Sequence, residues 1–220
     1  MGEAGEDGRG AAALPRPVRL YDAARAPNPR RVRIFLAEKG ITLPVRELAI
    51  MQGEHFAPEH MAKIGTHHVP ALELADGTIL TESVAICRYL EALTPEPPLM
   101  GRDPLEAAVI EMWQRRVEFQ LFMPIGFVLR HGNPAMQVLE RVQCPEWAEA
   151  NRPRVLEGLN WLDRRLQTSP FIAGDEFSIA DITGIVAIDF MRVIRQKIPE
   201  ECSALAEWAE RIHARPGCVA

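Results

Sequence analysis

Pro70 and the pair Glu82-Ser83 mark a stretch whose residue types suit the binding of a small peptide. Proline has no amide hydrogen, so within a sheet it belongs at an edge or at the start of a strand. Its peptide bond adopts the cis form at an intrinsic cost of about 0.5 to 1 kcal/mol. In that geometry Val69 turns its own N–H and C=O outward, where an extended peptide can pair with them as one more strand. A helix start after Thr81 aims free amides and a hydroxyl at the same opening, which suits a carboxylate.

The order of motifs in this stretch is more specific than any one of them. Residues 69–90 read Val-Pro-Ala-Leu, then Asp-Gly, then Glu-Ser-x-Ala-Ile-x-x-Tyr-Leu. This order closely resembles the glutathione-binding half of the soluble glutathione transferases, and the resemblance covers almost the whole chain from Val18 on. It implies a thioredoxin-like N-terminal domain, an all-helical C-terminal domain and glutathione as co-substrate. The alternative, an ordinary hairpin and helix without a ligand, leaves the shared order and spacing unexplained.

The thiol of such a ligand is mostly protonated near neutral pH, whereas the thiolate is the useful nucleophile. Each unit by which the thiol pKa is lowered requires a preference of about 1.4 kcal/mol for the charged form. A helix N-terminus and one hydrogen-bond donor each supply on the order of 1 kcal/mol. We expect such a helix to begin at Asn28, a favoured N-cap residue, with Pro29 at the first helical position and Arg30 and Arg31 in the first turn.

The resemblance bears on the donor to the thiol. In the family this donor is a Tyr near the end of the first strand, a Ser, or in some bacterial members an Asn, and a Cys replaces it in others. Here Ala26 stands where many members hold Ser, and no Cys lies in the region. The resemblance therefore implies that Asn28 is the catalytic residue. Two alternatives stay open: Asn28 is only a helix cap, or Tyr21, which otherwise reads as a buried packing residue, is the donor.

The resemblance also implies which residues bind glutathione. Val69 pairs its backbone with the cysteinyl part, and Pro70 is the cis residue. Glu82 and Ser83 take the γ-glutamyl ammonium and carboxylate.

Two histidines are candidates for the glycyl carboxylate of glutathione. His55 stands in a His-x-x-Pro-Glu context that is similar to several members, and His68 occupies a position where a Lys or Gln is common. The adjacent His67 and His68 have no acidic or cysteine partner at ligand spacing, so we expect loop histidines rather than a metal site.

Aromatic residues after position 118 provide candidates for the second substrate. Phe122 is the predicted substrate-binding residue, and Phe119, Met123 and Phe127 are the other members of a possible apolar wall over the thiol. Packing in a helix core explains such residues at least as well.

The elements that must position these residues follow from turn and cap signals. Asp76-Gly77 predicts a tight hairpin, and the period then changes from that of a strand to that of a helix. In the first half we expect strands over 18–21, 43–48, 71–74 and 78–80 and helices from Asn28 to Gly40 and after Thr81. The helix between the first two strands makes their pairing parallel, and residues 53–65 read as irregular.

The second half begins after a proline-rich segment, Thr94–Gly101. We expect helices over 104–130 with a kink at Pro124, over 145–167 with a bend or break at Pro153, from Ser178 to 195, and over 203–214. Ser178 and Asp181 form a capping box whose role we expect to be structural. The predicted organisation is a disordered lead-in at 1–17, the glutathione-binding domain at 18–93, a linker at 94–103 and an all-helical domain at 104–220.

Composition narrows the classes of function. The 220 residues are 47% hydrophobic and 25% charged, with a net charge of -5, which argues against nucleic acid as a partner. No apolar run reaches membrane-span length and no signal peptide is evident, so we expect a cytoplasmic protein without a membrane partner. The four cysteines are far apart and indicate neither a disulfide framework nor a zinc site. Residues 18–39 carry six basic and two acidic side chains, which favours an anionic ligand.

The resemblance predicts a glutathione transferase that activates the thiol of glutathione for conjugation to electrophiles or for reduction of disulfides or peroxides. By resemblance it is a homodimer with a role in detoxification. Ala26 favours an alternative, a non-catalytic binding or scaffold protein of the same fold. A glutathione-dependent isomerase is a further alternative, although the Ser-Cys-rich loop expected for that branch is missing.

Overall fold

The structure, a computed structural model, describes residues 13–219. The first twelve residues of the predicted lead-in at 1–17 lie outside this range. The first strand begins at Pro17, the last residue assigned to that lead-in. The carbonyl of Arg16 accepts a hydrogen bond from the amide of Ala75, and the carbonyl of Pro15 accepts one from the Tyr89 hydroxyl at 2.6 Å.

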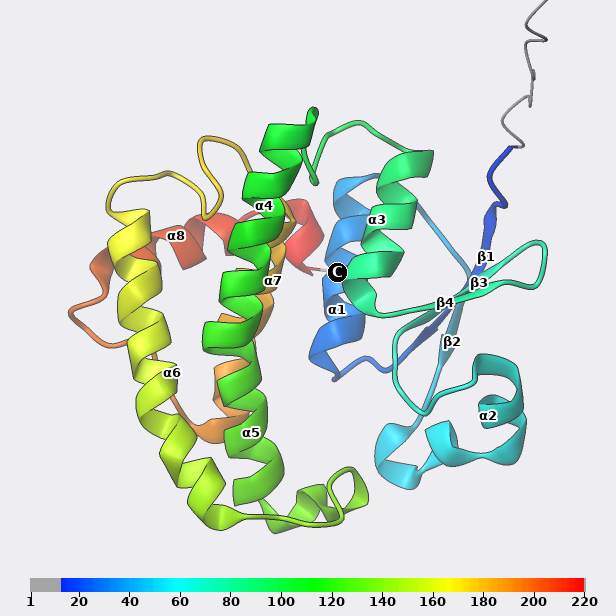
Figure 1. The fold of residues 1–220 in the computed structure, drawn as a ribbon, viewed down its shortest axis with the longest axis horizontal. Helices are drawn as coiled ribbons and strands as arrows, with labels where there is room; N and C mark the ends of the chain where they lie inside the picture. Colours follow the sequence, from blue (N-terminus) through cyan, green and yellow to red (C-terminus); the bar gives the residue numbers. More distant parts are fainter. Residues whose placement is uncertain (1–12, 220) are drawn as a thin grey trace, which may run out of the picture.

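A four-stranded sheet forms the centre of the first half of the chain (Figure 1). Its strands are β1 (Pro17–Asp22), β2 (Val45–Glu47), β3 (Ala71–Leu74) and β4 (Ile79–Thr81), in the spatial order β2-β1-β3-β4. As predicted, β2 is parallel to β1, whereas β3 is antiparallel to both β1 and β4. The register pairs Tyr21 with Ala71, so the end of β1 lies beside the residue that follows Pro70.

Helices cover both faces of this sheet. On one face α1 (Pro27–Glu38) and α3 (Ser83–Leu93) lie between the sheet and the helical second half (Figure 1). On the other face α2 (Pro58–Ile64) contributes to a smaller core with residues of β1 and β3. This helix is a correction, because residues 53–65 were expected to be irregular. Pro58 occupies the first turn of α2, and Gly65 ends the helix with a φ of 79°, which glycine adopts at no steric cost.

The second half is a bundle of helices. Its α-helices are α4 (Pro104–Val117), α5 (Met123–Gly132), α6 (Pro145–Leu166), α7 (Ile179–Phe190) and α8 (Ser203–His213). A π-helical turn, Glu118–Phe122, joins α4 to α5 without a break, and it stands directly before Pro124, where a kink was predicted. Because proline has no N–H to donate to the preceding turn, a local change of helix type at this point is expected. Pro153 lies inside α6 without dividing it.

Short 3-10 turns complete the secondary structure. They cover Ile50–Gln52, Glu54–Phe56, Pro134–Val138, Met191–Ile194 and Pro216–Val219.

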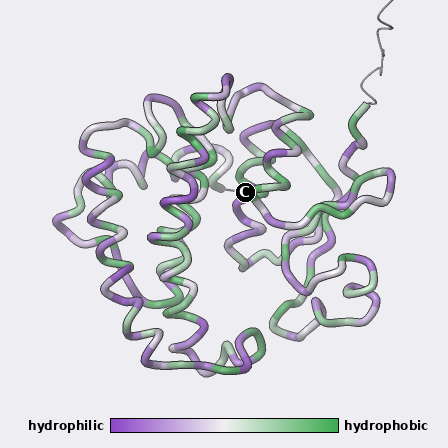
Figure 2. Tube along the Cα trace, viewed as in Figure 1, coloured by the Kyte–Doolittle hydropathy of each residue, from purple (hydrophilic) through white to green (hydrophobic). Residues whose placement is uncertain are grey.

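The centre of the bundle is α7, where every residue from Ile179 to Ile188 is buried. The predicted capping box begins this helix: the Ser178 side chain accepts from the first-turn backbone while the Asp181 side chain accepts from the Ser178 amide. Outer helices alternate between hydrophilic and hydrophobic residues along their length (Figure 2), as one-sided burial requires. Within residues 13–219 no helix is both long and apolar enough to cross a membrane.

Candidate functional site

The Val69–Pro70 peptide bond is cis, as the sequence predicts, and it directly precedes β3. Pro70 is buried and Val69 is half-buried. Among the described residues, the main-chain N–H and C=O of Val69 have no hydrogen-bond partner. Backbone polar groups are normally paired with protein or water, so this point of the chain can pair with an added extended strand.

The start of α3 stands next to this point through the β3–β4 pairing, in which Ala71 lies opposite Thr81. Glu82 is the N-cap residue of α3, its side chain is exposed, and its φ is 64°. A residue with a Cβ seldom adopts this left-handed region, and such strained residues cluster at ligand sites. Ser83, the first helical residue, is buried at 6% exposure, and its hydroxyl takes part in a buried hydrogen bond.

The first turn of α1 differs from the prediction in where it starts. Ala26 is the N-cap residue and Pro27 the first helical residue, so Asn28 lies inside the turn instead of capping it. Pro27 and Pro29 have no N–H, and the amide of Arg30 is already bonded to the carbonyl of Ala26. Asn28 therefore supplies the one main-chain N–H of this turn that is left for a ligand in the described chain.

The Asn28 side chain has a fixed partner on the same helix. Its Oδ1 accepts a hydrogen bond from Arg31 Nη1 at 3.0 Å, whereas its Nδ2 has no partner among residues 13–219. The same Arg31 Nη1 donates to Ser83 Oγ at 2.5 Å. Sequence reasoning placed Arg31 only as a nearby charge. The signal that it missed is the spacing of three residues from Asn28, which puts both side chains on one helix face.

Tyr21, the rival donor, faces the other side of the sheet. It is 2% exposed, its hydroxyl donates to Glu73 at 3.1 Å, and its ring packs edge-on against His60. Tyr21 belongs to the small core under α2, so the predicted role of a buried packing residue fits the structure.

The protein's own thiols are unsuited to nucleophilic chemistry at this site. All four cysteines are free, and three of them are buried. Burial raises the pKa of Cys87 to about 12 and that of Cys218 to about 11, and it also raises the pKa of Cys202. The exposed Cys144 lies in the second half, directly before α6. A reaction that needs a thiolate beside Asn28 therefore needs a thiol from the ligand.

The predicted histidines form a cluster with Phe56. His55 is 2% exposed, and neither of its ring nitrogens has a hydrogen-bond partner within residues 13–219. Its ring lies 4.0 Å from that of Phe56, which in turn stacks on His67. His68 is exposed and near the Thr66 hydroxyl. The structure thus brings His68 close to Val69 but keeps the His55 ring in the interior, so the two do not present a matched pair to one carboxylate.

Burial within this cluster makes stability depend on pH. Burial lowers the pKa of His55 and of His60 below that of a free imidazole, so below about pH 6.5 the unfolded chain binds more protons than the folded one. We expect the contribution of these two histidines to the free energy of unfolding to be constant above that pH and to fall as the pH decreases below it. In the H55Q/H60Q variant, urea unfolding should show a weaker fall of stability with decreasing pH than in the wild type, and an equal fall in the two proteins would contradict this expectation.

Phe122, the predicted substrate-binding residue, lies mostly in the interior. It is only 9% exposed, with its ring 5.8 Å from that of Phe190 and 5.2 Å from the Arg31 guanidinium. Phe119 and Met123 are far more exposed, at 53% and 38%. In this structure Phe122 packs between the two halves of the protein, and its role in substrate binding stays a prediction.

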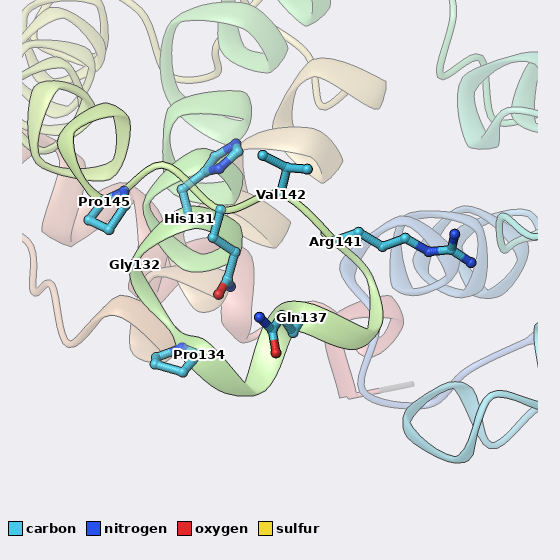
Figure 3. A pocket seen from close by; sticks show the side chains of 8 residues that line it. His131, Gly132, Pro134, Gln137, Arg141, Val142 and Pro145 are labelled. Atoms are coloured by element: carbon cyan, nitrogen blue, oxygen red, sulfur yellow. The ribbon is translucent and has the colours of Figure 1, made fainter.

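Two hollows stand outside the predicted site residues. The larger, of about 480 Å³, lies where α5 leads into α6, and Figure 3 shows the side chains around it, with Arg141 extending away from the others. The smaller, of about 260 Å³, lies between the first turn of α1 and the end of α7, and its lining includes Ala26, Pro27 and Phe190. Only the smaller one adjoins the turn that holds Asn28.

Comparison with known proteins agrees with this geometry. Residues 20–98 match the model of the glutathione S-transferase N-terminal domain, and residues 145–211 match that of the C-terminal domain. The chain is 40% identical over 200 residues to glutathione S-transferase 2 of Saccharomyces cerevisiae, over 90% of this chain and 86% of that protein. The crystal structure of Gtt2 from Saccharomyces cerevisiae has a TM-score of 0.87 at 38% identity, over 92% of this chain and 99% of that one. The maleylacetoacetate isomerase of Rattus norvegicus is 32% identical over 167 residues, 74% of this chain and 73% of that protein.

A mixed sheet with a cis-proline before its third strand, followed by a helical bundle, defines the thioredoxin-like transferase architecture. The chain belongs to the glutathione S-transferase family. The family, the fold class and the glutathione transferase class of enzyme that the sequence predicts are thereby confirmed.

Proposed function

We propose that the protein binds glutathione between Val69 and the start of α3 and ionises its thiol beside Asn28. The thiolate then attacks a small electrophile or reduces a disulfide or peroxide. In this proposal Val69 pairs its free N–H and C=O with the cysteinyl residue of glutathione. Exposed Glu82 takes the γ-glutamyl ammonium, and Ser83 takes the γ-glutamyl carboxylate together with the free amides of α3. His68, which is exposed and directly precedes Val69, takes the glycyl carboxylate.

One observation carries the proposal most strongly. Pro27 and Pro29 have no N–H, so two residues in the first turn of α1 cannot donate a main-chain hydrogen bond to a ligand. Asn28, which lies between them, offers both its main-chain N–H and its side-chain NH2 group. Donors held at a helix N-terminus favour the thiolate over the thiol. The protein's buried cysteines provide no competing nucleophile there.

The proposal extends to the setting of the protein. We propose that it acts in the cytoplasm as a homodimer, in detoxification of small electrophiles. Support comes from the absence of a membrane-spanning helix in the described chain and from relatives named as glutathione transferases.

A second candidate function is a glutathione-dependent isomerisation. The relative from Rattus norvegicus that is named a maleylacetoacetate isomerase favours it. The lack of serine and cysteine in the loop before α1 argues against the isomerase, because the Ser-Cys-rich loop expected for that branch is missing.

The direct test is retention on immobilised glutathione, followed by turnover assays. General electrophiles, a mixed disulfide of glutathione, an organic peroxide and a cis-dienoic acid are the four substrates. Retention with turnover of one of the first three is the expected result. Retention without turnover of any substrate favours the scaffold alternative. Turnover of the dienoic acid alone favours the isomerase. A protein that is not retained on immobilised glutathione contradicts the proposal.

A further inference from the structure

Arg31 is a charged residue in the interior, where both halves of the protein meet. Its side chain is 0% exposed. Nε donates to Thr183 Oγ1 of α7 at 3.0 Å, and Nη2 lies 3.7 Å from Glu118 Oε1 in the π turn. A buried charge is costly unless it is paired, and the buried Nη2 makes no hydrogen bond with any residue that the structure describes. The long contact with Glu118 alone therefore does not explain why a charged guanidinium is buried here.

The two hydrogen bonds that Nη1 donates indicate what Arg31 does. Nη1 carries two hydrogens, and the structure uses one for Asn28 Oδ1 at 3.0 Å and the other for Ser83 Oγ at 2.5 Å. An amide whose oxygen is occupied has only its NH2 group left for a ligand. A serine hydroxyl that accepts from an arginine likewise directs its own hydrogen elsewhere. One nitrogen thus leaves two neighbouring side chains as hydrogen-bond donors.

Glutathione needs donors at both positions. A thiolate and a carboxylate have no hydrogens to give and can only accept. Without the guanidinium, the Asn28 amide is free to rotate and present its oxygen to the sulfur, and Ser83 is free to present a lone pair to the carboxylate. Either arrangement repels the charged ligand.

We propose that Arg31 is a positioning residue that fixes Asn28 and Ser83 as donors toward the thiolate and the γ-glutamyl carboxylate of glutathione. This inference rests on the proposed function, because it assigns those two ligand groups to Asn28 and Ser83. The guanidinium acts through its neighbours, since it has no exposed surface from which to touch the ligand itself.

Arg215 offers a matched control. It also links α1 to the second half, through bonds to both carboxylate oxygens of Glu38 at 3.1 and 2.6 Å, and it lies 3.8 Å from the ring of Phe177. Its partner stands at the far end of α1 from Asn28. Loss of Arg215 removes a contact between the halves without changing the donors at the site.

The test is a double-mutant cycle on the thiol pKa of bound glutathione, followed by the ultraviolet absorbance of the thiolate across pH. R31M keeps the length of the side chain and removes every donor. We expect N28A and R31M each to raise the thiol pKa by about one unit, which is about tenfold less thiolate at a fixed pH. The thiol pKa in the N28A/R31M double variant should rise no further than in either single variant. R31K should show a smaller rise than R31M, and R215M should give the wild-type thiol pKa.

The outcomes separate this inference from the proposed function. Additive effects of R31M and N28A overturn the inference, because a charge that acts directly on the sulfur does not need Asn28, and an unchanged thiol pKa in R31M overturns it too. Wild-type protein that binds no glutathione, or leaves its thiol pKa at the free value, overturns the proposed function instead.

If R31M does not fold, a crystal structure of the wild-type protein with glutathione replaces the titration. The inference is supported if Arg31 Nη1 keeps its hydrogen bonds to both Asn28 and Ser83, and it is contradicted if Nη1 exchanges either bond for one to the ligand.

Discussion

Replacing Asn28 by alanine is expected to lower kcat for conjugation about tenfold while changing the Kd for glutathione less than about twofold. In the proposed function the side-chain amide is a single donor to the sulfur, and loss of one donor at a developing charge costs a factor of ten or more. The main-chain N–H of residue 28 remains in the variant, so the loss is smaller than for a complete oxyanion site. Steady-state kinetics and calorimetric titration measure the two quantities separately.

Asn28→Asp is the matched variant. It keeps the shape of the side chain and an oxygen for Arg31 Nη1, but it replaces the donor to the sulfur by a negative charge. Its kcat should fall below that of N28A, because like charges oppose ionisation of the thiol. Equal rates for wild type, N28A and N28D would remove Asn28 from the mechanism.

Replacing Asp181 by alanine is expected to lower the free energy of unfolding by about 3 to 5 kcal/mol. Asp181 is fully buried and accepts from the amides of Ile172 and Ser178 and from the indole N–H of Trp208, at 2.9 to 3.0 Å. Each of these donors is left in the interior without a partner in the variant, at about 1 to 3 kcal/mol per group before relaxation. Urea unfolding at neutral pH measures the loss.

An exposed cap provides the control for this second prediction. Asp103 also accepts from two backbone amides, those of Leu105 and Glu106 at 2.8 and 2.9 Å, but it lies on the surface. D103A should cost about 1 kcal/mol, because water satisfies the freed amides. If D181A lowers the free energy of unfolding no more than D103A does, then burial does not add to the contribution of the capping box to stability. D181N, which keeps Oδ1 for Ile172 and Trp208, should fall between the two.

Features governed by local rules could be predicted from the sequence. The cis bond before β3, the Asp76-Gly77 hairpin and the capping box at Ser178 each depend on a few adjacent residues with restricted conformations. The parallel pairing of β1 and β2 followed from the helix between them. These features determine the general position of the site, which is why the family and fold were accessible without a structure.

The misplaced details depend on contacts far apart in sequence or on a competition between similar signals. Ala26 and Asn28 both precede a proline, and the structure selects the earlier one as the N-cap. Arg31 is buried by Thr183, 152 residues away, which no local pattern reports. The π turn changes the helical register before Pro124, so Phe122 turns to the interior while Phe119 stays exposed.

The most direct test of the central claim is the number of protons released when glutathione binds. Calorimetric titration at about pH 7.5, in buffers that differ in ionisation enthalpy, measures it, with S-methylglutathione as the ligand that has no thiol to ionise. We predict the release of about one proton per glutathione bound and none for the methylated ligand, because the free thiol is protonated at this pH and the bound one is not. Equal proton release for the two ligands, or no binding of glutathione, would contradict the account.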